Sequence, residues 1–199
     1  GRFFGSAADR RCWNCGAEAF LFCGACRSVQ PAGASSSVDY FQIFGMRREY
    51  RIELGELERR YKDWQKKLHP DLVHSKSQRE REYAAEQSAR VIEAYRTLAD
   101  HLSRATYILK LAGVAVDEEE RITDPQLLAE IMELREAVDE ADDEASLTKI
   151  QADQLQDKFE GCSSSFERAY EDDEYEEALG SVRRMTYYKR AGEEILKKL

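Results

Sequence analysis

The sequence predicts an all-α protein built from an N-terminal zinc knuckle, a helical hairpin and a C-terminal three-helix bundle. Charged residues make up 35% and hydrophobic residues 42% of the 199 residues, with only three prolines, which is typical of a helix-rich globular chain. Apolar residues recur three and four positions apart in several long stretches, as they do along one face of an amphipathic helix. Four of the five cysteines form two CxxC pairs near the start of the chain, a spacing typical of metal sites.

Charge is divided unevenly between the two halves of the chain. Residues 117–199 contain 25 acidic and 11 basic side chains, a net charge of −14, whereas residues 1–116 have a net charge of +5. An acidic surface repels phosphates, so this half argues against a general nucleic-acid-binding protein. No apolar run approaches the roughly 18 residues that a membrane-spanning helix needs. We therefore expect neither nucleic acid nor a membrane among the partners.

Residues 1–30 are predicted to fold around a metal ion. The two CxxC pairs are separated by seven residues, and each pair can turn two thiolates toward one point. Four thiolates leave no open coordination position, so a Zn²⁺ ion here would have a structural role and would contribute to folding. Gly16 and Gly24 are expected where the backbone turns tightly around the ion. The four predicted ligands are Cys12, Cys15, Cys23 and Cys26.

Other uses of these cysteines remain open. Two disulfides or a redox-active CxxC would also employ paired cysteines, but a thioredoxin-type CxxC opens a helix after a strand, and that context is missing here. Iron–sulfur clusters are likewise held by four thiolates.

A linker and a helical hairpin are predicted after the cysteines. Residues 31–37, PAGASSS, are small, polar and rich in helix breakers, which is typical of a domain boundary. The next domain, residues 38–112, is expected to open with a short helix over DYFQIFG that ends at its glycine. Each of its two long helices has an apolar face. The first face consists of Leu54, Leu57, Tyr61, Trp64 and Leu68, and the second of Val91, Ala94, Tyr95 and Leu98.

The end of the first long helix contains an unusual combination of residues. Pro70 ends the helix because it lacks an N–H group and pushes the preceding residue out of the helical region. His69 and Asp71 are therefore expected in a stiff turn that points to solvent. No candidate nucleophile lies near them in the sequence, so a catalytic dyad is not expected. Three basic residues share roughly the face opposite the apolar one, namely Arg59, Lys62 and Lys66.

Three further amphipathic helices predict a bundle over residues 124–199. Leu102–Gly113 is expected to continue the second hairpin helix, and residues 113–123 form a connector to the bundle. Asp124 followed by Pro125 is typical of a helix N-terminus. The predicted core residues are Leu127, Ile131, Leu134 and Val138 in the first helix, Leu147, Ile150, Leu155, Phe159, Cys162, Phe166 and Tyr170 in the second, and Ala178, Leu179, Val182, Met185, Tyr188, Ile195 and Leu199 in the third. The lone Cys162 is accordingly predicted to be a buried, inert thiol.

The first bundle helix also has a second face, away from its core stripe. A methionine lies there beside three glutamates. Such a face is often ordinary surface, but it also suits a mixed apolar and acidic docking patch. The face includes Ala129, Met132, Glu133, Glu136 and Glu140, with Leu128 at its edge.

The order of motifs in the hairpin resembles a J domain. DYFQIFG is followed by a basic amphipathic helix, the tripeptide HPD and a helix that contains VIEAYRTL. J domains stimulate ATP hydrolysis by DnaK-type chaperones. The resemblance implies chaperone contacts by His69, Pro70 and Asp71, with electrostatic attachment by Arg59, Lys62 and Lys66. Asp71 would pair with an arginine of the partner, and the proline would limit the entropy lost on docking.

Residues 38–199 as a whole resemble the HscB family of iron–sulfur cluster co-chaperones. The resemblance rests on the J domain, on SRATYILKLAG as a hinge and on LLAEIMELREAVDEAD in an acidic bundle. The leading CxxC pairs are similar to the metal-binding module of eukaryotic members. In this family the bundle binds an IscU-type scaffold protein that holds a nascent cluster. The implied contact residues are Leu128, Ala129, Met132, Glu133, Glu136, Glu140 and Tyr187, of which Ala129 replaces a larger apolar residue and Tyr187 a phenylalanine.

The implied function is that of a co-chaperone that is not an enzyme. The J domain would trigger ATP hydrolysis on the DnaK-type chaperone while the bundle delivers the scaffold, so that the two events coincide. The resemblance implies the mitochondrial matrix, with the cytosol as a second site, and the arginine-bearing residues 1–11 are compatible with the tail of a transit peptide. A J-domain co-chaperone with a different client is the alternative. A zinc-dependent nucleic-acid or signalling module is a third hypothesis, which the acidic tail weakens.

Overall fold

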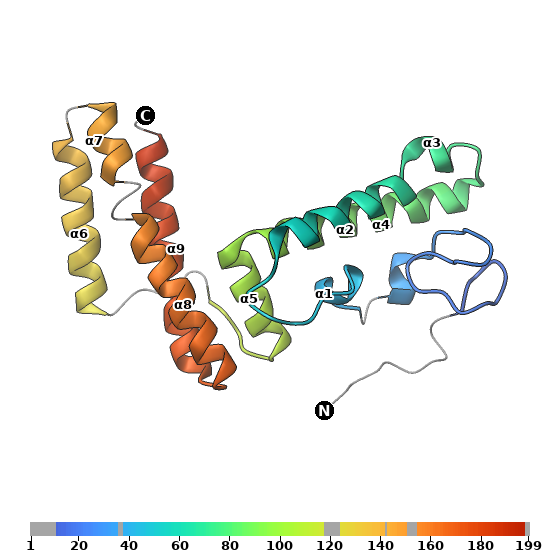
Figure 1. Ribbon diagram of the computed structural model, residues 1–199, viewed down its shortest axis with the longest axis horizontal. Helices are drawn as coiled ribbons and strands as arrows, with labels where there is room; N and C mark the ends of the chain where they lie inside the picture. Colours follow the sequence, from blue (N-terminus) through green and yellow to red (C-terminus); the bar gives the residue numbers. More distant parts are fainter. Residues whose placement is uncertain (1–10, 36–37, 118–123, 142, 151–154, 198–199) are drawn as a thin grey trace. The chain divides into compact units, whose positions relative to one another are not determined.

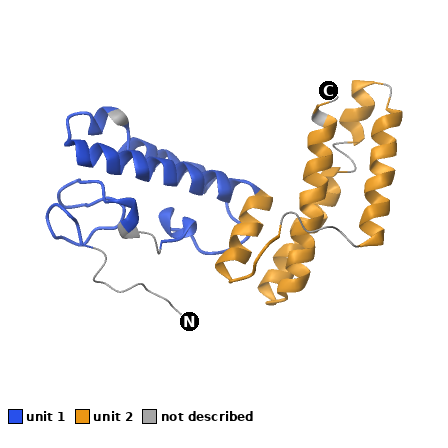
Figure 2. Cartoon of the chain, turned by 180° about the vertical axis from the view of Figure 1, so that it is seen from behind, with its two compact units in different colours: residues 1–100 blue, residues 101–199 orange. Residues whose placement is uncertain are grey.

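The structure is a computed structural model that describes residues 11–35, 38–117, 124–141, 143–150 and 155–197 (Figure 1). These residues form helices and two isolated β-bridges but no strand, so the predicted all-α fold is confirmed. The chain divides into two compact units, residues 1–100 and residues 101–199 (Figure 2). The finer boundaries at residues 31–37 and 113–123 remain predictions. Among the described residues, no helix has both the length and the apolar character needed to cross a membrane.

Among the residues that the structure describes, each unit has two or three long helices with shorter ones beside them. The first unit contains the 3-10 helix η2 (Ala32–Ser35) and the α-helices α1 (Tyr40–Ile43), α2 (Leu54–Lys67), α3 (Pro70–Val73) and α4 (Gln78–Ala99). The second contains α5 (His101–Leu111), α6 (Pro125–Glu140), α7 (Glu144–Lys149), α8 (Asp157–Glu171) and α9 (Tyr175–Leu196).

Helix α1 is a single turn whose ends are set by specific residues. The Asp39 carboxylate accepts from the Gln42 backbone N–H at 2.8 Å, and the Gln42 side chain accepts from the Asp39 N–H at 3.0 Å. This reciprocal pair is a capping box. Gly45, with a φ of +61°, follows the helix in the left-handed conformation that the sequence predicted for its end.

Helices α2 and α4 pack side by side as the predicted hairpin (Figure 1). Leu57 and Leu98 are completely buried, and the rings of Tyr61 and Tyr95 stack with centroids 4.2 Å apart. The apolar faces are therefore largely as predicted. Leu54 is the exception, because it is the first residue of α2 and remains 46% exposed.

The second long helix does not continue through Leu102–Gly113, and that prediction was wrong. Helix α4 ends at Ala99, and Asp100 has extended backbone angles (φ −89°, ψ 127°) before α5 begins. The two compact units also divide at this residue. Apolar spacing did not reveal the break, since one extended residue leaves the three-and-four spacing of buried side chains nearly unchanged.

The second unit has a continuous apolar core formed by the predicted stripes of α6 and α9 together with Leu147 of α7 and Leu155. Its fully or nearly buried members include Leu127, Ile131, Leu134, Val138, Leu147, Leu155, Tyr188 and Ile195. Where the sequence predicted one second helix, the described residues contain two, α7 and α8. Residues 151–154 between them, and the predicted core residue Leu199, lie outside the described residues. Cys162 on α8 is half-buried against this core, less than predicted, and burial raises the pKa of its thiol.

Candidate functional site

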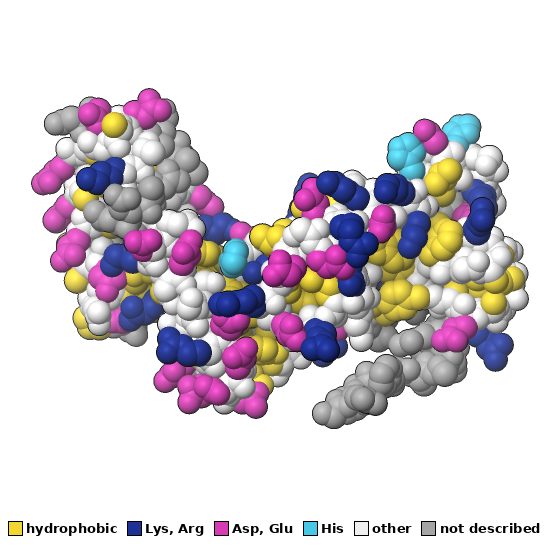
Figure 3. All heavy atoms as spheres, viewed as in Figure 1, with side chains coloured by type: hydrophobic (Ala, Val, Ile, Leu, Met, Phe, Trp, Pro, Cys, Tyr) yellow, Lys and Arg dark blue, Asp and Glu magenta, His cyan; other side chains and the backbone are white. Residues whose placement is uncertain are grey.

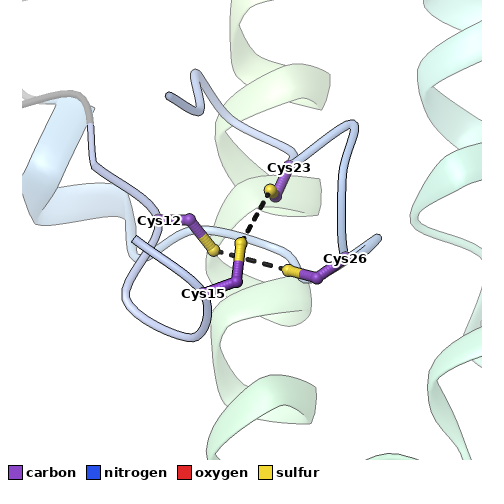
Figure 4. Close-up of side chains that lie close together, drawn as sticks. All are labelled: Cys12, Cys15, Cys23 and Cys26. Carbon is purple, nitrogen blue, oxygen red and sulfur yellow. Dashed lines mark hydrogen bonds between the residues drawn. The ribbon is translucent and has the colours of Figure 1, made fainter. Parts of the chain in front are cut away.

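The four cysteines of the N-terminal module converge on one point (Figure 4). Their sulfur atoms all lie within 4.8 Å of one another. The Sγ atoms of Cys12 and Cys26 are 3.5 Å apart, and those of Cys15 and Cys23 are 3.6 Å apart. A disulfide joins two sulfurs at about 2.05 Å, whereas sulfurs about 2.3 Å from a tetrahedral zinc are about 3.8 Å from one another. The donor set and its spacing therefore fit a metal ion.

The two CxxC pairs form the same backbone loop. The Gly16 N–H donates to the Cys12 carbonyl, and the Arg27 N–H donates to the Cys23 carbonyl, both at 2.9 Å. Both loops close with a left-handed residue, since φ is +74° at Gly16 and +59° at Arg27. The prediction that Gly24 provides the second tight turn was wrong, because Arg27 occupies the position equivalent to Gly16.

Polar groups also surround the sulfur atoms. The Asn14 backbone N–H lies 3.4 Å from Cys12 Sγ, and the Gln30 side-chain amide lies 3.3 Å from the same atom. Ser28 Oγ is 3.4 Å from Cys26 Sγ, and its hydroxyl lowers the pKa of that thiol to about 6 by hydrogen bonding to the thiolate. Such donors favour the thiolate, the form in which cysteine binds a metal.

The His-Pro-Asp tripeptide lies between α2 and α4, and its His69 and Asp71 are exposed as predicted. Pro70 begins the one-turn helix α3, where its fixed φ suits the first helical position. The side chain of Asp71 is 89% exposed and that of His69 is 55% exposed. His69 Nδ1 accepts from the Asp71 backbone N–H at 3.3 Å. The predicted stiff turn is thus a short helix, and the Asp71 carboxylate faces solvent.

The three basic residues of α2 are exposed, but each has an acidic neighbour on its own helix. Arg59 lies 2.7 Å from Glu56, Lys62 lies 2.7 Å from Glu58, and Lys66 lies 3.6 Å from Asp63. Arg59 and Arg60 lower the pKa of Glu56 to about 2. Figure 3 shows basic and acidic side chains interspersed over this part of the first unit.

Sequence reasoning missed these acidic partners, although their spacing was readable. Glu58 and Lys62 are four positions apart, and Asp63 and Lys66 are three apart, which places each pair on one helix face. The face is therefore of mixed charge, with a smaller positive potential than its basic residues alone imply.

The second face of α6 is exposed in the structure. Met132 is 62% exposed and Leu128 is 44% exposed, which is unusual for large apolar side chains. Ala129, Glu133, Glu136 and Glu140 are exposed as well. Tyr187 on α9 is half-buried against the bundle core, with the Arg190 guanidinium 5.8 Å from its ring centroid. All seven predicted positions thus lie on α6 and α9 of one unit, six of them on α6.

These features define a class of protein. A helical hairpin whose His-Pro-Asp turn has an exposed His69 and Asp71, followed by a helical unit with an exposed apolar and acidic face, is the architecture of a J-type co-chaperone. The known proteins that the chain resembles belong to the same class.

The comparisons with known proteins identify the family. The HSCB C-terminal oligomerisation domain family matches residues 123–196. An iron–sulfur cluster co-chaperone protein HscB homolog of Arabidopsis thaliana is 61% identical over 200 residues, covering 100% of this chain and 78% of that protein. The iron–sulfur cluster co-chaperone protein HscB of Homo sapiens is 35% identical over 197 residues, covering 95% of this chain and 83% of that protein.

A solved structure agrees with these sequence matches. The crystal structure of the human co-chaperone protein HscB has a TM-score of 0.85 and 34% sequence identity, covering 95% of this chain and 98% of that chain. The chain therefore belongs to the HscB family of iron–sulfur cluster co-chaperones. The named relatives are co-chaperones, which are not enzymes.

Proposed function

We propose that this protein stimulates the ATPase of a DnaK-type chaperone and delivers an IscU-type scaffold protein to it for iron–sulfur cluster assembly and transfer. Membership of the HscB family supports the co-chaperone role. The observation that best supports the chaperone contact is the solvent-facing carboxylate of Asp71 on a helix that begins with proline. In this function the partner hydrolyses the ATP, and the present chain provides binding and orientation.

The chaperone contact follows from the geometry of the tripeptide. The exposed Asp71 carboxylate can pair bidentately with an arginine of the chaperone. Pro70 fixes the backbone in advance, so little conformational entropy is lost on docking. Arg59, Lys62 and Lys66 steer the encounter with an acidic surface, to an extent that their acidic neighbours reduce.

The scaffold contact is assigned to the exposed face of α6 together with Tyr187. Met132 and Leu128 provide apolar area that is otherwise left in water. The glutamates beside them provide charge that selects a basic partner surface. The proposed contact residues are Leu128, Ala129, Met132, Glu133, Glu136, Glu140 and Tyr187. Holding the scaffold on the same chain as the J domain raises its local concentration at the chaperone.

The metal of the N-terminal module is proposed to be Zn²⁺ in a structural role. Four thiolates at tetrahedral spacing suit zinc and leave no position for a substrate. Cys12, Cys15, Cys23 and Cys26 would hold the ion, which supplies folding free energy to the loops. The proposed location is the mitochondrial matrix, with the cytosol as a second site, as the family resemblance implies.

Replacing His69 with glutamine tests the proposed trigger. In His69→Gln we expect loss of ATPase stimulation, measured by phosphate release from the chaperone, while scaffold binding stays at the wild-type level. His74→Gln is the matched control, because His74 is also exposed and lies just after α3. Stimulation that survives His69→Gln would show that the tripeptide is not the trigger.

A further inference from the structure

The cysteine module and the segment that follows it, up to Val38, contact one stripe of residues on α4. Four α4 residues contact the module or the segment that follows it, at spacings of four, four and three positions, which places them on one helix face. They are Arg79, Tyr83, Gln87 and Arg90. This stripe borders the buried apolar face of α4, and the buried Gln87, four positions before Val91, belongs to both.

An aromatic contact joins the module to the first turns of α4. The ring of Trp13 meets that of Tyr83 edge-on, with centroids 5.8 Å apart. The Arg79 guanidinium lies 4.8 Å from the Trp13 centroid and 5.5 Å from that of Tyr83. Trp13 is fixed within the module, because its Nε1–H donates to the Val29 carbonyl at 2.8 Å. The three side chains therefore form one cluster of edge-to-face aromatic and cation–π contacts.

A buried glutamine links a cysteine ligand to the middle of α4. The Gln30 side-chain amide lies 3.3 Å from Cys12 Sγ, and its backbone carbonyl accepts from Gln87 Nε2 at 3.0 Å. Gln30 is 3% exposed and Gln87 is 0% exposed. Arg90 extends the contact by donating to the Val38 carbonyl at 2.5 Å. A buried hydrogen bond thus connects α4 to the residue that contacts Cys12.

The first half of α4 has little apolar burial of its own. Its buried residues before Val91 are Glu80, Ala84 and Gln87, whereas the second half buries Val91, Ala94 and Leu98. The contacts of Trp13 and Gln30 therefore add support to a part of α4 that buries little apolar surface.

The same half of α4 anchors the loop that follows the His-Pro-Asp turn. Ser77 Oγ accepts from the Glu80 backbone N–H at 3.2 Å. The Arg81 guanidinium donates to the Lys76 carbonyl at 3.0 Å and lies 3.4 Å from the His74 carbonyl. Loss of order in the first turns of α4 would therefore release this loop and, with it, α3.

We infer that the metal-loaded module is a positioning element of the J domain. By holding the first half of α4, Trp13 and Gln30 fix the turn that presents Asp71, so metal loss weakens docking on the chaperone. This inference rests on the proposed function. Positioning changes the fraction of molecules that are competent to bind, so it changes the concentration needed for half-maximal ATPase stimulation and leaves the maximum unchanged.

The test compares the Zn²⁺-loaded full chain with two variants that disrupt the support. One variant, Cys15→Ser with Cys26→Ser, removes the metal site, and the other, Tyr83→Ala, removes the ring that contacts Trp13. Tyr83→Phe keeps the ring, and Glu86→Ala changes an exposed residue of the same half of α4. Amide hydrogen exchange is followed over residues 78–90 and 91–99, and ATPase stimulation is titrated.

Both disruptive variants are expected to show local loosening. Exchange over residues 78–90 should be about tenfold faster, and that over residues 91–99 should be unchanged. The half-maximal concentration should rise about tenfold at an unchanged maximum, since only the competent fraction falls. Tyr83→Phe and Glu86→Ala should match the wild-type chain in both measurements.

Several results would overturn the inference. Unchanged exchange in both variants would show that the module does not support α4, and faster exchange without a change in half-maximal concentration would show that α4 does not position the turn. Equally faster exchange over residues 91–99 would indicate global unfolding instead. A lower maximum of ATPase stimulation would indicate that the module contacts the chaperone directly. A wild-type chain that gives no stimulation contradicts the proposed function rather than this inference.

Discussion

At the scale of single residues, backbone conformation distinguishes two glycines that look equivalent in the sequence. Gly16 has a φ of +74°, while Gly24 is not in the left-handed region. A Cβ atom at either position would meet nothing within 4 Å. Any difference between alanine variants at the two positions therefore reports backbone strain alone, and no steric clash contributes to it.

We expect Gly16→Ala to weaken the metal site and Gly24→Ala to leave it intact. Left-handed backbone at a non-glycine residue costs on the order of 1 kcal/mol, so zinc should leave Gly16→Ala about fivefold faster. The measurement is transfer of zinc to a coloured chelator, starting from wild-type protein that contains about one zinc per chain by metal analysis. Equal release from both variants would refute the backbone explanation, and wild-type protein without zinc would refute the zinc assignment.

At the scale of elements, α2 shows that opposite charges on one helix weaken the attraction of a partner. Lys62 Nζ lies 2.7 Å from Glu58 Oε1, and both side chains are more than half exposed. An exposed pair of this kind stabilises the helix only weakly. Its larger effect is on the field that an approaching chaperone meets.

Removing the Glu58 charge is expected to strengthen chaperone docking at low salt. In Glu58→Gln the half-maximal concentration for ATPase stimulation should fall about twofold, and the gain should vanish near 0.5 M salt, where screening is strong. Glu86→Gln on α4 is the charge-matched control. Weaker docking in Glu58→Gln would mean that the ion pair orders Lys62 for the contact.

The bundle contains an ion pair that is less exposed than the Glu58–Lys62 pair of α2 and that also binds a tyrosine hydroxyl. Lys158 Nζ lies 2.8 Å from Glu130 Oε2, and the Tyr188 hydroxyl donates to the same oxygen at 2.7 Å. Lys158 and then Tyr188 lower the pKa of Glu130 to about 2, from an ordinary value of 4.5. Burial and the Glu130 carboxylate raise the pKa of Tyr188. The three residues thus join α6, α8 and α9.

This pair predicts a stability difference that depends on pH. Because the folded-state pKa of Glu130 is depressed, its contribution is complete above pH 4.5 and is lost as the pH falls toward 2. Glu130→Gln should therefore lower the free energy of unfolding by about 2 kcal/mol at pH 7 and by less than half of that near pH 3. Urea unfolding at both pH values measures this, with the exposed Glu160→Gln as control. A loss that is equal at both pH values would contradict the assignment.

Most elements were predictable because their signals are local. Asp124 and Pro125 mark the start of α6, and apolar spacing identified the buried faces of α2, α4, α6 and α9. The break at Asp100 was not predictable from apolar spacing, which continues on both sides of it. The left-handed Arg27 was also missed, because arginine gives no signal for that conformation.

At the scale of the whole molecule, the two proposed contacts lie in different compact units and should fail separately. In Met132→Ala with Glu136→Ala, scaffold binding in a pull-down should fall about tenfold or more, since one change removes buried apolar area and the other a charge. Basal ATPase stimulation without scaffold should match that of wild type. Met132→Ala with Glu171→Ala, which has the same charge change away from α6, is the control for Glu136. Full scaffold binding in the first variant would refute the patch.

The candidate site was predicted where its residues are close in the sequence and missed where they are not. The two CxxC pairs and the tripeptide are short motifs, so their convergence and exposure could be expected. The bond between Gln30 and Gln87 joins polar residues 57 positions apart, and no periodic pattern indicates such a pairing. A stripe of polar and aromatic residues on α4 was the available signal, and it was missed because a search for apolar spacing passes over polar residues even where, as at Gln87, they are buried.

The stripe of Arg79, Tyr83, Gln87 and Arg90 has an evolutionary consequence. In a descendant chain that loses the four cysteines and the loops around them, Arg79, Tyr83 and Gln87 lose their contacts with Trp13 and Gln30 and become free to vary as ordinary surface. Gain of the module likewise requires substitutions in two distant parts of one gene. Ancestry of the metal-binding extension should therefore be traceable in the composition of a single helix face, even in genomes where the extension itself has been deleted.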